Sequence, residues 1–196
     1  PTAKSGGNTV NGTFSFTAKL TSGGTTTAVT SATVLGARTW TLTASFTPAD
    51  SNYSTPSPIA VQLTVNQAPL SITVNSASRV YGAANPTFTG TVTGLVNGDT
   101  LGTTVTVAYS TTATVASAVG TYPISANISG ASAADYDLTV TAGTLTITQA
   151  PLTVTVNDAT RAYGAANPTF TDTVTGLLNG DTVTVTYSTT ATVTSP

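Results

Sequence analysis

The sequence QAPLSITVN at residues 67–75 decides the fold, because it returns as QAPLTVTVN at residues 149–157. In both copies apolar side chains alternate with serine or threonine, which is the pattern of a β-strand with one buried face. The distance from residue 67 to residue 149 is 82 positions. A strand pattern that returns at this spacing predicts a tandem array of β modules.

The repeat extends well beyond this strand. RVYGAANPTF at residues 79–88 returns 82 positions later as RAYGAANPTF at residues 161–170. Further on, YSTTATV occurs at residues 109–115 and again at residues 187–193, and the first copy carries additional residues, 101–104, before it. Repeats accept insertions in exposed connections, so these additional residues predict a surface hairpin loop.

The chain therefore divides into three predicted segments. Residues 66–148 form a complete module, and residues 149–196 form the first half of a second one. Residues 1–65 have no Tyr-Gly opening strand and form the second half of a related module. The boundaries are expected near residues 65–67 and 148–150, where each closing strand runs into the next Gln-Ala-Pro.

Strand patterns recur along the chain, and turn formers separate them. The pairs NP at residues 85–86, NG at 97–98 and AG at 142–143 are typical of loops, and no segment has the period of a helix. Short strands with regular turns predict an all-β fold of tandem immunoglobulin-like β-sandwich modules. The expected core of the complete module consists of alternating apolar residues: Leu70, Ile72, Val74, Tyr81, Phe88, Val92, Leu95, Val105, Val107, Tyr122, Ile124, Ile128, Tyr136, Leu138, Val140, Leu145 and Ile147.

Composition excludes several classes of function. Only 6% of the residues are charged and the net charge is -2, which leaves no basic surface for nucleic acid. Histidine, cysteine and glutamate are absent, so the usual general bases and the soft metal ligands are missing. We therefore predict that the chain is not an enzyme, and that it has no catalytic residue and no resident cofactor.

The same composition suits a location outside the cell. No apolar stretch is long enough to span a membrane, and no signal peptide opens the chain. Any export signal must lie elsewhere or have been removed. Cysteine and methionine, the side chains that oxidise most easily, are absent. An extracellular or cell-surface location is the expectation that follows.

Four short sequences give the complete module a family resemblance: YG at residues 81–82, GTYPI at 120–124, DY at 135–136 and GTLTI at 143–147. On these grounds residues 67–148 and 149–196 resemble the bacterial immunoglobulin-like repeats known as MBG domains of the YGX type. The resemblance covers the whole of the complete module.

Residues 1–65 resemble the second half of a related bacterial immunoglobulin-like repeat. The matching sequences are GTFSF at residues 12–16, FTPADSNY at 46–53 and VQLTV at 61–65. Together the two resemblances imply a structural repeat segment of a bacterial extracellular stalk, adhesin or filament, whose partners are neighbouring modules or identical subunits. The alternative is an adhesive module that binds a carbohydrate or a host surface, with a glycan as the partner.

The two end segments look like complementary halves of one module. Residues 149–196 stop before any counterpart of residues 120–147, and residues 1–65 lack the opening strand. Two explanations stay open. Either the chain is a window cut from a longer protein, or the end of one subunit completes the start of the next by strand addition, which closes open sheet edges.

Calcium is the one metal that the sequence brings into question. Asp135 with Asp137, and Asp50 with Asn52, are the candidate pairs, because Ca²⁺ takes its ligands from carboxylate and amide oxygens. It needs six to eight such ligands, and no known calcium-loop spacing occurs here. The alternative is that these aspartates cap or form turns.

The aromatic residues are expected to be structural. Trp40 alternates with Leu42 and Ala44, which predicts a core position in a strand. A sugar-binding platform is the alternative for the aromatic rings. The tyrosines to which we assign structural roles are Tyr53, Tyr81, Tyr122, Tyr136 and Tyr163.

One arginine stands beside the Tyr-Gly pair in each MBG-like repeat. Arg79 and Arg161 occupy equivalent positions. Each is either a contact at the junction between modules or an exposed charge that protects a strand edge, and the sequence favours the exposed charge.

Overall fold

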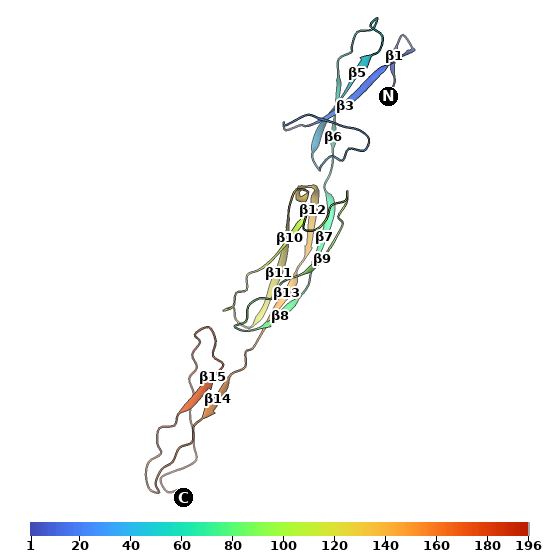
Figure 1. Cartoon of the computed structure of the whole chain (residues 1–196). Helices are drawn as coiled ribbons and strands as arrows, with labels where there is room; N and C mark the ends of the chain where they lie inside the picture. Colours follow the sequence, from blue (N-terminus) through green and yellow to red (C-terminus); the bar gives the residue numbers. More distant parts are fainter. Residues whose placement is uncertain (196) are drawn as a thin grey trace. The chain divides into compact units, whose positions relative to one another are not determined.

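The computed structural model describes residues 1–195, so Pro196, the last residue of the predicted third segment, lies outside the described part (Figure 1). Its regular elements are strands β1 to β15 and a short 3-10 helix, η1 (Ala133–Asp135). This confirms the all-β prediction. Within the described residues, no helix has the length and apolar character that crossing a membrane requires.

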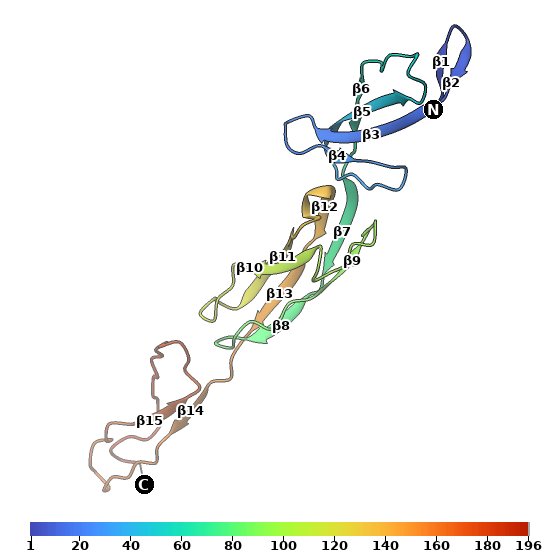
Figure 2. The same ribbon diagram turned by 45° about the horizontal axis from the view of Figure 1, so that its top comes forward.

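The first segment contains one small hairpin and one four-stranded antiparallel sheet (Figure 2). The hairpin pairs β1 (Ala3–Ser5) with β2 (Asn8–Val10). The sheet has the order β4-β3-β5-β6, formed by β3 (Gly12–Leu20), β4 (Thr27–Ala28), β5 (Thr39–Pro48) and β6 (Ile59–Thr64). Threonine is abundant in these strands because its branched Cβ suits an extended, half-exposed backbone.

The central repeat contributes a three-stranded sheet and a four-stranded sheet. The three-stranded sheet has the order β12-β7-β9, formed by β7 (Ala68–Val74), β9 (Gly90–Thr93) and β12 (Tyr136–Thr141). The four-stranded sheet has the order β10-β11-β13-β8, formed by β8 (Ala77–Val80), β10 (Thr106–Thr111), β11 (Gly120–Ser129) and β13 (Gly143–Thr148). β12 runs parallel to β7 and β13 parallel to β8, whereas β11 and β13 are antiparallel.

Alternate side chains of these strands form the core, as the sequence predicted. One cluster joins Leu70, Val105 and Tyr136, with Val92 of β9 and Ile128 of β11 packed against it, so it contains residues of both sheets. None of the seventeen predicted core residues is exposed. Eight of them are buried: Leu70, Ile72, Val74, Val105, Ile124, Tyr136, Leu145 and Ile147.

The third segment has far less regular structure. β14 (Thr153–Val156) and β15 (Asp172–Thr175) form a two-stranded antiparallel sheet. No described residue of 149–195 is buried. This segment therefore presents one layer of a module without a second layer against it.

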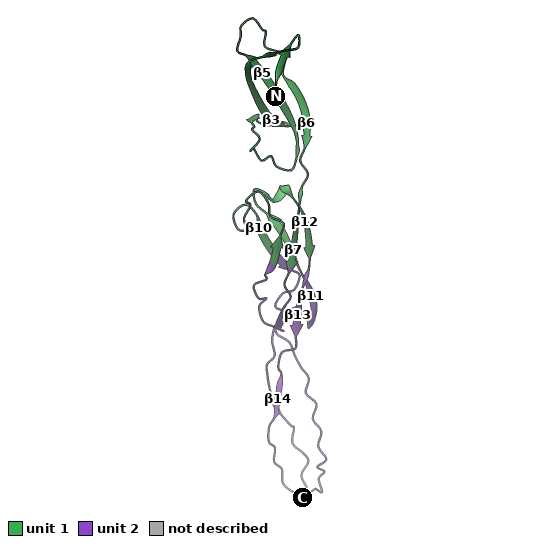
Figure 3. Cartoon of the chain, turned by 90° about the vertical axis from the view of Figure 1, so that its right-hand side faces the viewer, with its two compact units in different colours: residues 1–73, 91–108, 126–141 green, residues 74–90, 109–125, 142–196 purple. Residues whose placement is uncertain are grey.

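The chain separates into two compact units (Figure 3). Unit 1 contains residues 1–73, 91–108 and 126–141, and unit 2 contains residues 74–90, 109–125 and 142–195 of the described chain. Residues of the central repeat occur in both units. The module boundaries suggested by the repeat stay a prediction.

Candidate functional site

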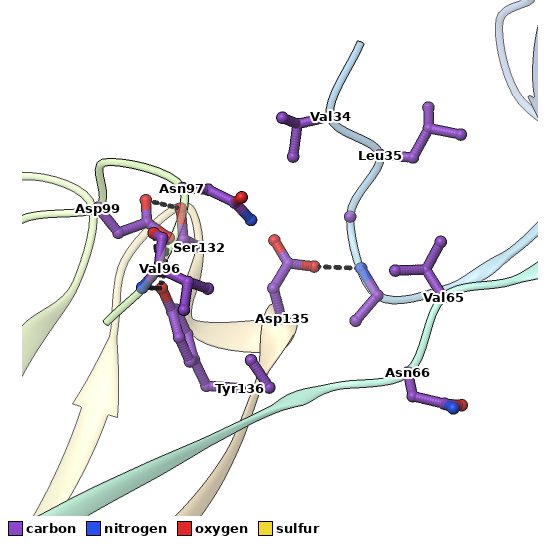
Figure 4. Close-up of a pocket in the computed structure, with 13 residues that line it drawn as sticks. Val34, Leu35, Val65, Asn66, Val96, Asn97, Asp99, Ser132, Asp135 and Tyr136 are labelled. Carbon is purple, nitrogen blue, oxygen red and sulfur yellow. Dashed lines mark hydrogen bonds between the residues drawn. The ribbon is translucent and has the colours of Figure 1, made fainter. Parts of the chain in front are cut away.

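A cleft of about 270 Å³ lies within unit 1, at the start of strand β12 (Figure 4). The turn that leads into η1 brings polar side chains to this cleft. Gly130 makes the turn possible with a φ of 116°, and its carbonyl accepts a hydrogen bond from the backbone N–H of Ala133. The residues that matter for its chemistry are Asn97, Asp99, Ser132, Asp135 and Tyr136.

A hydrogen-bond network centred on Asp99 connects one side of the cleft. The Tyr136 hydroxyl donates to Asp99 Oδ2 at 2.7 Å, and Ser132 Oγ donates to Asp99 Oδ1 at 2.8 Å. The backbone N–H of Val96 donates to the Tyr136 hydroxyl at 3.0 Å. The ring of Tyr136 is buried in the core, so this network ties the loop of residues 96–99 to β12.

The network shifts two ionisation equilibria in opposite directions. Hydrogen bonds from Tyr136 and then Ser132 stabilise the carboxylate and hold the pKa of Asp99 below its ordinary value. Burial raises the pKa of Tyr136, and the nearby charge of Asp99 contributes to the same direction. Both shifts favour a charged Asp99 that accepts a hydrogen bond from a neutral Tyr136.

Acid should therefore remove the contribution of Asp99. A carboxyl with a lowered folded-state pKa stabilises the fold above its unfolded pKa, and this stabilisation is lost as the pH falls through the folded pKa. We expect Asp99→Asn to reduce the fall in Tm between about pH 6 and about pH 2, measured by circular dichroism. Asp137→Asn, on an exposed position of β12, is the matched control and should leave the fall unchanged. An undiminished fall in the Asp99 variant would contradict the role given to it.

The predicted calcium candidates lie in different local environments. Asp135 Oδ1 accepts the backbone N–H of Ala37 at 2.7 Å, and Asp137 is exposed on β12. Asp50 Oδ1 accepts the backbone N–H of Asn52 at 2.9 Å, which is the turn-forming arrangement. No group of three or more acidic, histidine or cysteine side chains that could hold a metal ion occurs among residues 1–195.

Three of the aromatic residues with predicted structural roles are partly buried, and two of them donate hydrogen bonds to neighbouring backbone. Trp40 Nε1 donates to the carbonyl of Gly36 at 2.9 Å, and the Tyr122 hydroxyl donates to the carbonyl of Ala118 at 3.0 Å. Tyr81 is also half-buried. Tyr136 is buried, and the structural roles given to these residues stay a prediction.

Two tyrosines are not packed as a core role requires. Tyr53 is 43% exposed and Tyr163 is 78% exposed. Tyr163 lies two residues after Arg161, and among the described residues of this segment the only sheet is two-stranded, so none of them forms a second layer over its ring. The ring of Tyr163 is therefore exposed in this chain, although its sequence equivalent Tyr81 is half-buried.

The preferred interpretation of Arg79 as an exposed charge is wrong. Arg79 is only 8% exposed. Its Nε donates to Asn85 Oδ1 at 2.7 Å, and its Nη2 donates to the carbonyl of Thr114. Asn85 Nδ2 in turn donates to the carbonyl of Ala113 at 2.7 Å. Arg79 and Asn85 thus clamp the Tyr-Gly turn to the loop after β10, and we call this pair the Arg–Asn clamp.

The clamp is built a second time in the next repeat. Arg161 Nε donates to Asn167 Oδ1 at 2.9 Å, and Arg161 Nη2 donates to the carbonyl of Thr192. Asn167 Nδ2 donates to the carbonyl of Ala191 at 2.8 Å. The signal for this pair in the sequence is the asparagine that stands six positions after the arginine in both copies.

The backbone conformation explains why the second residue of the Tyr-Gly pair is glycine. Gly82 and Gly164 adopt φ values of 81° and 80°, a left-handed conformation that side chains with a Cβ disfavour. In both copies this glycine lies in a turn, closed by Ala83 N–H to the Val80 carbonyl in the first and by Ala165 N–H to the Ala162 carbonyl in the second. The motif therefore sets the turn that the clamp holds.

Comparison with known proteins identifies these two repeats. The profile of the MBG domain (YGX type) matches residues 70–146 and residues 152–196, which together are more than half of the chain. No curated protein and no solved structure matches the chain. The repeated strand, the Tyr-Gly turn and the profile match agree, and the chain belongs to the MBG domain family of the YGX type.

Proposed function

We propose that this chain is a structural segment of a bacterial extracellular stalk, adhesin or filament, with no catalytic activity of its own. The observation that carries the proposal is the Arg–Asn clamp, which is built twice with the same donors and acceptors in successive repeats. Repetition of a stabilising device suits a spacer, because every repeat must fold by the same contacts. Membership of a bacterial surface-repeat family supports the same role.

The chemistry of the described residues also supports a structural role. In the network around Asp99, the carboxylate accepts hydrogen bonds from Tyr136 and Ser132. Asp135 accepts a backbone amide. These groups are used to hold loops and strands in place. Threonine supplies polarity where charge is scarce, and it suits the half-exposed surface of a strand.

One observation favours the alternative of a carbohydrate-binding module. The ring of Tyr163 is 78% exposed, and exposed aromatic faces suit sugar rings. A glycan array probed with the whole chain separates the two. Reproducible binding that Tyr163→Ala abolishes would support the alternative, whereas an array without binding supports the structural role.

The location of the protein in the producing cell tests the proposal directly. Antibodies raised against the chain should label intact, unpermeabilised cells that produce it, with immunogold particles outside the envelope. Antibody against a cytoplasmic protein of the same cells is the control and should label only after permeabilisation. Label confined to the cell interior would contradict the proposed function.

A further inference from the structure

The four-stranded sheet of the first segment has one apolar face. Its register places Phe14 opposite Phe46 and Leu42 opposite Val61, and the residues between them on each strand point to the other face. Eleven apolar residues share this face: Phe14, Phe16, Ala18 and Leu20 on β3, Trp40, Leu42, Ala44 and Phe46 on β5, and Ile59, Val61 and Leu63 on β6. The other face of the same strands is dominated by threonine and serine.

Strand β6 is the least covered part of this face. Ile59 is 72% exposed, Val61 59% and Leu63 38%. β6 is also an edge strand, paired with β5 on one side only. An apolar edge strand of this kind is a template for pairing with another strand.

The central repeat shows which strand pairs with the equivalent edge in a complete module. In it Tyr122 of β11 is opposite Leu145 of β13, and 82 positions earlier Trp40 of β5 is opposite Leu63 of β6. The pair β5–β6 therefore corresponds to β11–β13. The outer side of β13 carries the parallel strand β8, with Thr146 opposite Ser78. β6 has no such partner in its sheet.

The third segment contains a sequence counterpart of β8. Residues 159–162 correspond to β8 at an offset of 82, yet they are not in a strand. Its apolar residues are uncovered as well: Leu152, Val154 and Val156 are 42–57% exposed, whereas their equivalents Leu70, Ile72 and Val74 are at most 5% exposed. The second half of the module is what buries these positions in the central repeat.

We propose that the first segment of one copy binds the third segment of a second copy, with β6 paired in parallel to residues 159–162. The register carried over from the central repeat places Leu63 opposite Ala159, Thr64 opposite Thr160 and Val65 opposite Arg161. The apolar face around β6 then covers the exposed apolar residues of the β14–β15 layer. This rests on the proposed structural function and gives it a means of assembly.

The correspondence with the central repeat applies to the β6 edge and not to every strand. In the central repeat β10 pairs with β11 on the side away from β13, and in the first segment β3 pairs with β5 at the equivalent place, on the side away from β6. Residues 187–193, which repeat 109–115 at the end of β10, therefore lie outside the shared sheet in the assembled form. The proposal predicts a composite sandwich with β3 in place of a β10 equivalent.

Disulfide trapping tests the register, since the chain contains no cysteine. Thr64→Cys and Thr160→Cys are introduced into separate copies at exposed positions, one copy carries a mass tag, and the two are mixed under mild oxidation. Strand partners have Cα separations compatible with a disulfide. We expect a tagged–untagged heterodimer, and at least about tenfold less when Thr153→Cys replaces Thr160→Cys, because β14 belongs to the opposite layer. Equal trapping of both pairs, or none, would overturn the register.

A second measurement tests the apolar face. Val61→Asp places a charge on it, whereas Gln62→Asp places the same charge on the opposite face of β6. In sedimentation velocity the unmodified chain and the Gln62 variant should associate as concentration rises, and the Val61 variant should remain monomeric. Association that survives Val61→Asp, or a monomeric unmodified chain, contradicts the proposal. Neither result bears on the location of the protein outside the cell, so failure of this inference is distinguishable from failure of the proposed function.

Discussion

Replacing Arg79 by alanine should lower the free energy of unfolding of the central repeat by about 3 kcal/mol, because hydrogen bonds made by a charged donor contribute about 1.5–3 kcal/mol each and the loss leaves acceptors unpaired. The side chain is 8% exposed and donates to Asn85 Oδ1 and to the carbonyls of Val80 and Thr114. Urea unfolding followed by circular dichroism measures the change.

The next repeat supplies a matched control for this substitution. Arg161 makes the equivalent hydrogen bonds, but its partners are solvent-exposed. Water can replace a bond in such a place, so Arg161→Ala should cost less than about 1 kcal/mol. Arg79→Lys should recover little of the lost stability, because an ammonium group lacks the planar fork that reaches several acceptors. Equal effects at the two arginines would mean that burial does not set the importance of the clamp.

The strands and the core were predictable because they depend on local pattern. Leu70, Ile72 and Val74 alternate with polar residues, and alternation alone places them on one face of a strand. The repeat confirmed the strand by showing it twice. Burial of Leu145 and Ile147 follows from the same period.

The clamp and the Asp99 network were harder to foresee because their partners are distant in sequence. Arg79 meets Thr114 across 35 positions, and Tyr136 meets Asp99 across 37 positions. Charged residues are mostly exposed, so an isolated arginine is assigned to the surface unless its acceptors are known. Only the tertiary arrangement identifies those acceptors.

Tyr163 shows why a repeat does not guarantee equal burial. Its sequence context matches that of Tyr81, and the local turn is the same in both copies. The environment of a ring also depends on the layer packed against it, which the third segment does not contain among its described residues. Sequence similarity transfers the turn but not the neighbours.

Protection of the backbone amides against hydrogen exchange should differ strongly between the three segments. The central repeat buries side chains from both of its sheets, whereas residues 149–195 bury none and residues 1–65 bury only Ala18 and Phe46. Segments that bury little apolar surface open at low free energy, so their amides exchange rapidly. Amides of β7, β11 and β13 should be protected at least about a thousandfold more than those of β14 and β15.

Amide hydrogen exchange of the intact chain, at a concentration where sedimentation shows a monomer, is therefore the most direct measurement. The predicted result is strong protection within residues 67–148, with rapid exchange in residues 1–65 and 149–195. Raising the concentration until the chain associates should protect β6 and residues 159–162 together. Equal and strong protection of all three segments in the verified monomer would contradict the claim that the end segments depend on a neighbouring module.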